Sequence, residues 1–274
     1  MEINKKVAFD EDDKTLINYL QKHNISFDEE YNILEMYESD PHWEYIEKYV
    51  QKARLSVLSE TIFTKEELQN AEWMCVRSVW HYDYPQPFDN REYETVTYTR
   101  KHKCQECGQG LEQIDLFRMK KPPKWGKRHF MMMNWVGDEL FVDEYAKTLL
   151  EKEFPYLSFC EVKNKKGTEV FSGVFQIVIP KTLNEGVVEQ QRRMREVLVC
   201  PCCRKKKYHT NGEGMLQMQR KAFADALDIA KTAEWFGWGC GADRRLIINQ
   251  RMYQFILSHR LERSLEFSPI ELVD

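Results

Sequence analysis

Four cysteines form two pairs with the spacing of metal ligands. Two residues separate Cys104 from Cys107, which Gly108 follows, and the same spacing separates Cys200 from Cys203. Such spacing lets both sulfurs reach one ion, and the glycine permits a tight left-handed turn after the pair. Four thiolates are also the number that a closed tetrahedral structural site takes. We therefore predict that these four cysteines bind one structural zinc ion.

Other uses of the cysteine pairs stay open from the sequence alone. The 92 residues between Cys107 and Cys200 exceed the usual spacing of a zinc ribbon, so each pair could bind its own ion with a histidine such as His102 or His209. Cys202 could also replace either cysteine of the second pair. A redox pair normally stands at a helix N-terminus, whereas basic residues follow the second pair here. Four cysteines also close the shell that a catalytic zinc must leave open.

Familiar catalytic signatures are absent from the sequence. The seven histidines form neither the H-E-x-x-H pattern nor the zinc-deaminase pattern. The glycine-rich stretch 236–241 lacks the phosphate-loop pattern, and we interpret it as a turn whose Trp235, Phe236 and Trp238 pack on the core. We expect no enzymatic activity, and an unrecognised pocket near Trp235 to Arg245 is the enzymatic alternative. The cysteines outside these pairs are expected to pack as small apolar residues: Cys75, Cys160 and Cys240.

Composition favours a protein of the cytoplasm without membrane contact. The chain has 274 residues, of which 42% are hydrophobic, enough for one large or two medium cored domains. It lacks an apolar run long enough for a membrane span, and its first residues lack the apolar region of a secretory signal. Eight cysteines are too sparse for a disulfide scaffold, so we expect thiolates in a reducing compartment.

Two similar segments predict an internal repeat that positions the cysteine pairs. Residues 140–162 and 246–270 each show a strand pattern, a helical pattern and a second strand pattern, and each follows a cysteine pair. Asp143 and Asn249 stand at the same place in the two segments, where a short polar side chain can cap the helix. We therefore predict two halves, each made of a zinc knuckle and a strand-helix-strand unit.

The segments before and between these units carry their own patterns. Apolar residues recur every three or four positions from residue 12 to 60, which predicts two or three helices, and Thr64 to Glu67 form a capping box for one more. Residues 76–80 and 93–99 are predicted as strands of a hairpin or meander, 131–133 and 170–180 as strands, and 183–199 as a helix.

Together these patterns predict an α+β fold. We expect an acidic helical region at residues 1–70 and a mixed domain at residues 71–274. The mixed domain would divide into two related zinc-knuckle and strand-helix-strand halves, at about 71–180 and 181–274. Residues 1–70 contain 16 acidic and 8 basic residues, so the net charge of −4 conceals an acidic front and a slightly basic remainder.

Basic residues flank both cysteine pairs and suggest nucleic-acid binding as an alternative function. A basic face with Trp125 or Tyr208 available for stacking would suit phosphates and bases. Cations also offset the negative charge of a four-thiolate zinc site, and the acidic overall charge argues against a dedicated nucleic-acid binder. The residues concerned are Arg100, Lys101, Lys103, Arg118, Lys120, Lys121, Lys124, Lys127, Arg128, Arg204, Lys205, Lys206 and Lys207.

The two cysteine pairs and the ending Leu265 to Ile270 resemble the bacterial double-CXXCG-motif proteins, which look related to immunity proteins encoded beside polymorphic toxins. The resemblance covers roughly residues 100–274, and Arg204 stands where the family has its second glycine. It implies a non-enzymatic protein that neutralises a toxin by binding it. An acidic front would suit a basic toxin, since complementary charge speeds encounter. The candidate contact residues are Glu29, Glu30, Glu35, Glu38, Asp40, Glu44 and Glu47.

Overall fold

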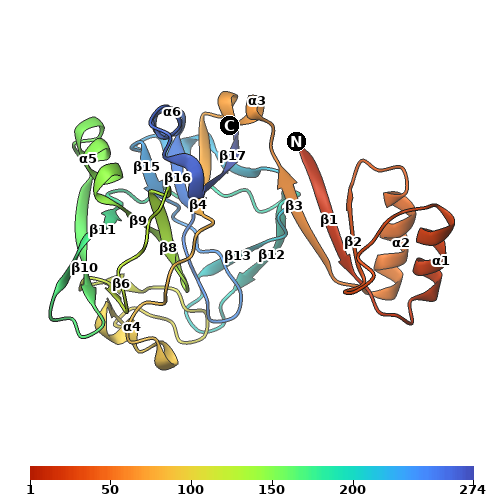
Figure 1. Ribbon diagram of the computed structural model, residues 1–274, viewed down its shortest axis with the longest axis horizontal. Helices are drawn as coiled ribbons and strands as arrows, with labels where there is room; N and C mark the ends of the chain where they lie inside the picture. The colour runs from red at the N-terminus through yellow and green to blue at the C-terminus, as the bar shows by residue number, and fades with distance from the viewer.

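The computed structural model describes residues 1–274 and shows a mostly β protein (Figure 1). Strands contain 34% of the residues and helices 22%, and the chain begins with a strand. The predicted α+β class with an N-terminal helical region is therefore wrong. Strands form the frame of every part of the molecule, and the helices cover or cap them.

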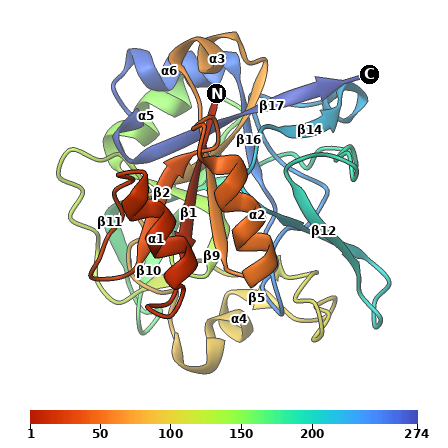
Figure 2. The same cartoon turned by 90° about the vertical axis from the view of Figure 1, so that its right-hand side faces the viewer.

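An N-terminal module contains two helices on one face of a small antiparallel sheet (Figure 2). Its strands have the order β2-β1-β3, and Val7, Leu34 and Ile46 lie in its separate core. Figure 1 shows the helices on the side of the module that faces away from the rest of the protein. The elements are β1 (Glu2–Ala8), α1 (Lys14–Lys22), β2 (Ile33–Tyr37), α2 (Trp43–Ala53) and β3 (Val57–Ile62).

Helices α1 and α2 confirm two of the two or three helices predicted for residues 12–60, but the segment between them is strand β2, because short amphipathic segments fit two periods. Tyr31, Leu34 and Tyr37 have helical spacing, but the burial of β2 alternates, with Leu34 and Met36 inside and Ile33 and Tyr37 outside. The capping box at Thr64 is confirmed, and helix α3 (Lys65–Asn70) follows it.

The remainder of the chain, here called the repeat domain, contains two five-stranded sheets. Sheet one has the order β7-β10-β11-β9-β8, and sheet two has the order β14-β17-β4-β16-β15. Sheet one contains β7 (Arg118–Met119), β8 (Phe130–Met133), β9 (Val136–Val142), β10 (Ser158–Asn164) and β11 (Val170–Val178). Sheet two contains β4 (Trp73–Ser78), β14 (Leu216–Gln219), β15 (Ile229–Lys231), β16 (Leu246–Asn249) and β17 (Leu265–Val273).

The two sheets have the same arrangement, position by position. Their central strands, β11 and β4, run antiparallel to both neighbours, while β7 and β14 pair in parallel with β10 and β17. In chain order, however, β4 comes before the first cysteine pair but lies in sheet two, and β11 comes before the second pair but lies in sheet one. The first repeat (residues 73–164) and the second repeat (residues 170–273) thus exchange their first strands.

The strand-helix-strand units hold the two sheets together. Helix α5 (Glu144–Glu153) follows β9, and helix α6 (Gln250–Ser258) follows β16. As predicted, Asp143 and Asn249 cap these helices, accepting hydrogen bonds from the backbone N–H groups of Ala146 at 2.8 Å and Met252 at 3.0 Å. The largest core contains residues of both sheets and both helices, and two further cores cover the outer faces of the sheets.

Several of the sequence expectations for the connecting segments were wrong. Residues 93–99 form mainly helix α4 (Tyr93–Val96), followed by the short strand β5 (Tyr98–Thr99), and β4 pairs with β16 and β17 instead of forming the predicted hairpin. Residues 183–199 contain no α-helix and end in strand β12 (Met194–Val199). Short 3-10 helices lie at Asp89–Arg91, Arg220–Phe223 and Glu262–Ser264. No helix of the protein has the length and apolar character that crossing a bilayer requires.

Polar contacts join the N-terminal module to the repeat domain. The ammonium group of Lys5 lies 2.6 Å from the Glu213 carboxylate, and Arg192 forms an ion pair with Glu38. Thr61 donates its hydroxyl to the carbonyl oxygen of Gly212 at 2.8 Å. These contacts fix β3 against residues 212–214 and leave space between the module and sheet two.

Candidate metal centre

Each cysteine pair lies in the loop of a small hairpin. Strands β5 and β6 (Glu112–Gln113) flank the first pair, and β12 and β13 (Lys206–Thr210) flank the second. The two loops repeat one hydrogen-bond pattern. Cys104 donates its N–H to the carbonyl of Gln109 at 2.8 Å, and Cys200 donates to the carbonyl of Lys205 at 3.0 Å. The predicted zinc knuckles therefore have the same backbone in both repeats.

The residue after each pair adopts the left-handed conformation. The φ angle is +78° at Gly108 and +62° at Arg204. Both residues donate their N–H groups back to the first cysteine of the pair, at 2.9 and 3.0 Å. Arg204 thus takes the turn that a glycine would favour, at a conformational cost of about 1 kcal/mol.

The fold brings all four predicted ligands together. The sulfur of Cys104 lies 3.7 Å from that of Cys200, and the sulfur of Cys107 lies 3.6 Å from that of Cys203. All four sulfurs lie within 4.8 Å of one another, and three of the four residues are buried. The group could hold one metal ion between the two repeats.

The alternative ligands lie outside this group. Cys202 is exposed, and neither His102 nor His209 belongs to the cluster of ligand atoms. The ring of His209 instead packs against Trp238, with 4.4 Å between the ring centroids. The remaining cysteines also lie outside the ligand group. Cys75 and Cys160 are half-buried on the sheets and pack in part as predicted, whereas Cys240 is exposed.

The thiols of the metal-free cluster differ in acidity. The backbone N–H of Cys107 is the main cause that lowers the pKa of Cys104 to about 6, whereas burial raises the pKa of Cys107 to about 12. Since ligands bind a metal as thiolates, an ion must displace the proton of Cys107. Protons therefore compete with a metal ion for these sulfurs, so metal binding should weaken as the pH falls.

Two side chains tie the knuckles to each other. Buried Lys207 donates from Nζ to the carbonyl oxygens of Cys107 at 3.1 Å and Gly241 at 3.3 Å, and also to that of Gly239. Gln109 donates from Nε2 to the carbonyl of Lys206 at 2.9 Å. Sequence reasoning placed Lys207 on an exposed basic face. Only the contact with the 239–241 loop, distant in the sequence, makes it a buried support of the first knuckle.

The glycine-rich loop has a structural role beside the first knuckle. Phe236 is buried, as predicted, but Trp238 is 61% exposed and does not pack on the core. A Cβ atom added to Gly108 would lie 2.0 Å from the carbonyl oxygen of Cys240. The loop therefore packs directly against the backbone of the knuckle turn.

Ion pairs or burial account for part of the predicted basic face. Arg100 and Lys103 form ion pairs with the buried Glu94, and Lys206 pairs with Glu189 at 2.6 Å. Lys207 is buried, so only Arg204 and Lys205 of the basic run after the second pair remain unpaired at the surface.

Comparison of the chain with protein-family models, curated proteins and solved structures found no match.

Proposed function

We propose that this protein is a non-enzymatic, zinc-stabilised protein that binds a basic partner protein, as an immunity protein binds a toxin. The observation that supports this proposal most is an open, partly apolar sheet face on the acidic N-terminal module. The cysteine motifs add the resemblance to double-CXXCG and immunity proteins.

Zinc suits the four-cysteine group in number, chemistry and distance. A tetrahedral ion with zinc–sulfur bonds of about 2.3 Å places its sulfurs about 3.8 Å apart. The observed contacts of 3.6 and 3.7 Å lie close to that value. Because four protein thiolates leave no open coordination position, the ion would join the two repeats and take no part in a reaction.

The open face of the N-terminal sheet carries exposed apolar side chains. Helices cover one face, while Ile33 and Tyr37 of β2 and Leu58 and Ile62 of β3 point from the other. Their exposed fractions are 36%, 44%, 73% and 43%. Strand β2 is also an edge strand, whose free backbone groups can pair with another chain. Such a face fits a protein partner better than a small molecule.

The charge of the module suggests which partner this face would select. Among the candidate acids, Glu35, Glu38 and Glu44 already form ion pairs. Asp40 accepts a hydrogen bond from the backbone N–H of His42. Of the other candidates, Glu29 and Glu30 are exposed and Glu47 is half-buried, and none of the three forms an ion pair. A basic protein would meet a complementary field, which raises the rate of encounter and excludes acidic competitors.

The proposal can be tested by affinity capture from the native host with two matched baits. The first carries Ile33→Ser and Tyr37→Ser on the open face, and the second carries Ile114→Ser and Tyr145→Ser, which are 65% and 53% exposed elsewhere. We expect wild type and the second bait to retain one basic protein that the first bait loses. The purified partner should then bind wild type more weakly as salt increases. Equal capture by both variant baits, or an acidic partner, would refute the proposal.

A further inference from the structure

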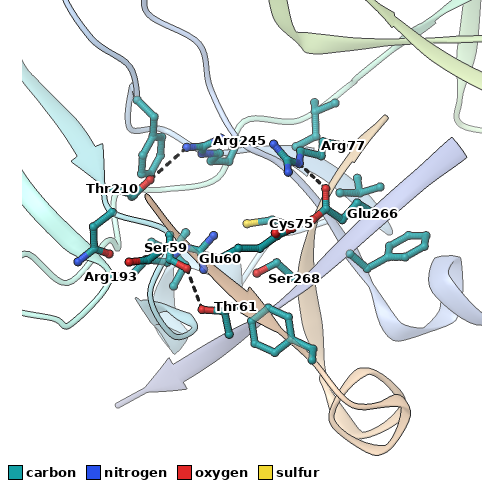
Figure 3. A pocket seen from close by; sticks show the side chains of 18 of the residues that line it. Ser59, Glu60, Thr61, Cys75, Arg77, Arg193, Thr210, Arg245, Glu266 and Ser268 are labelled. Carbon is teal, nitrogen blue, oxygen red and sulfur yellow. Dashed lines mark hydrogen bonds and ion pairs between the residues drawn. The ribbon is translucent and has the colours of Figure 1, made fainter. Parts of the chain in front are cut away.

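A cavity outside the metal centre lies between the N-terminal module and sheet two (Figure 3). It has a volume of about 640 Å³, within the range of about 300–1,000 Å³ for small-molecule sites. Strand β3 forms one wall with Ser59 and Thr61, while β4 and β17 form the opposite wall with Cys75 and Ser268.

Three arginines converge on this cavity around Cys75, as Figure 3 shows. Only Arg77 has a carboxylate partner, with its Nε atom 2.6 Å from Glu266. Arg193 donates to the carbonyl oxygen of Gly214, and Arg245 makes only a long hydrogen bond of 3.4 Å to the Thr210 hydroxyl. Neither Arg193 nor Arg245 forms an ion pair, although the carboxylates of Glu60 and Glu266 also line the cavity.

The surroundings of these two arginines make an anion favourable. Burial lowers the pKa of both Arg193 and Arg245, and the positive charges of the neighbouring arginines act in the same direction. Although protein surrounds Arg245, its side chain keeps access to solvent because it faces the cavity. An anion in the cavity would offset the burial and mutual repulsion of the arginines, which the negative charges of Glu266 and Asp243 oppose only in part.

The matching position on sheet one shows how a charged side chain can be neutralised within the protein. Strand pairing makes Gln176 the counterpart of Cys75, because they pair with Phe141 of β9 and Ile247 of β16. Two residues before these partners, Glu139 occupies the position of Arg245. Glu139 accepts a hydrogen bond from Gln176 at 3.1 Å and forms an ion pair with Lys231.

The charge on sheet one is therefore satisfied from within the protein. Sheet two has the opposite charge at the matching position, and Arg245 forms no ion pair there. We propose that the cavity on sheet two binds a small organic phosphate of about mononucleotide size, with Arg193 and Arg245 holding the phosphate group. The inference does not rest on the proposed partner protein or on the metal, although Leu58 of the open sheet face also lines the cavity.

The lining distinguishes an organic phosphate from a bare anion. Guanidinium groups match the oxygens of a phosphate, and the hydroxyls of Thr210 and Ser268 add hydrogen-bonding capacity. The rings of Phe63, Phe236 and Phe267 also line the cavity. They provide apolar contact for a part of the ligand beyond its phosphate.

Calorimetry of the full chain with AMP, inorganic phosphate and adenosine tests this proposal. We expect AMP to bind most tightly, phosphate more weakly and adenosine not detectably. Arg193→Gln and Arg245→Gln should each weaken AMP binding tenfold or more, as expected for a lost charged hydrogen bond. Arg195→Gln removes the same charge from an exposed residue of β12 outside the cavity and should leave binding unchanged.

A second measurement keeps the test valid if a variant fails to fold. Iodoacetamide labelling of wild type, located by mass spectrometry, should be slowed by AMP at Cys75 but not at the exposed Cys240. Absence of binding by both AMP and phosphate, adenosine binding as tight as AMP, or unchanged labelling of Cys75 would each overturn the proposal. An equal loss of affinity in Arg195→Gln would also overturn it.

Discussion

The two knuckles share one backbone turn but reach it with different residues. Gly108 and Arg204 have similar left-handed φ angles and the same return hydrogen bond to the first cysteine. The carbonyl of Cys240 lies against Gly108 and leaves no room for a side chain, whereas Arg204 carries one. The comparison teaches that contact with a neighbouring loop demands glycine in the first knuckle, and that the turn itself tolerates another residue.

The largest expected effect tests whether the knuckles act as one site. Cys104→Ser and Cys200→Ser should each abolish metal binding and lower the free energy of unfolding by about 4 kcal/mol or more, because one shared ion is lost in both cases. Elemental analysis and denaturant unfolding provide the measurements, with exposed Cys202→Ser as the control that keeps its metal. If either variant retained about half of the wild-type zinc, the knuckles would be separate sites.

Alanine at positions 108 and 204 tests why the first knuckle has a glycine after its cysteine pair. Gly108→Ala should lower the free energy of unfolding by about 3 kcal/mol, since left-handed strain adds to a collision with backbone. Arg204→Ala keeps a Cβ atom in the same conformation and should change it by less than about 0.5 kcal/mol. Chemical denaturation of the metal-loaded proteins compares the two, and similar losses would show that the turn alone determines the residue.

Two neighbouring lysines of the second hairpin, Lys206 and Lys207, should also contribute unequally to the free energy of unfolding. Lys207→Met leaves the carbonyl groups of the first knuckle and the 239–241 loop without their donor, and should cost about 2 kcal/mol. Lys206→Met removes an exposed ion pair with Glu189 and should cost less than about 1 kcal/mol. Thermal unfolding at matched zinc content distinguishes them, and equal shifts would contradict a supporting role for Lys207.

The smallest expected effect is the pH-dependent contribution of Asp243 to the free energy of unfolding. Asp243 accepts a hydrogen bond from the N–H of Gly137 at 3.2 Å, and burial raises its pKa from 3.8 to about 6. The folded protein holds this proton more tightly than the unfolded chain, so the charged carboxylate lowers stability above pH 6, and this penalty disappears as the pH falls below 4. Asp243→Asn should therefore stabilise the protein by on the order of 1 kcal/mol at pH 7.

The free energy of unfolding, measured at pH 7 and at pH 4, checks the sign of this effect. The advantage of Asp243→Asn should shrink as the pH falls toward 4, since Asn keeps an oxygen that can accept the hydrogen bond from Gly137. A variant that is less stable than wild type at pH 7 would show that the carboxylate charge is needed.

The sequence correctly predicted those features that residues close together in the chain determine. The spacing of Cys104 and Cys107, the cap at Asp143 and the capping box at Thr64 each depend on residues within a few positions. Strand β2 was missed because five residues fit either period. A pocket near Trp235 to Arg245 was named as an alternative, but its lining and the role of Lys207 could not be predicted, since both depend on segments that only the folded chain brings together.

The exchange of β4 and β11 has a consequence for how the chain assembles. Sheet one lacks its central strand until residue 178 has been synthesised, and sheet two cannot form around β4 until almost the whole chain has left the ribosome. Cleavage between β10 and β11 would leave each fragment with the central strand of the other. The repeat-domain parts of the two fragments should therefore be unfolded alone and fold when mixed, in the manner of a heterodimer.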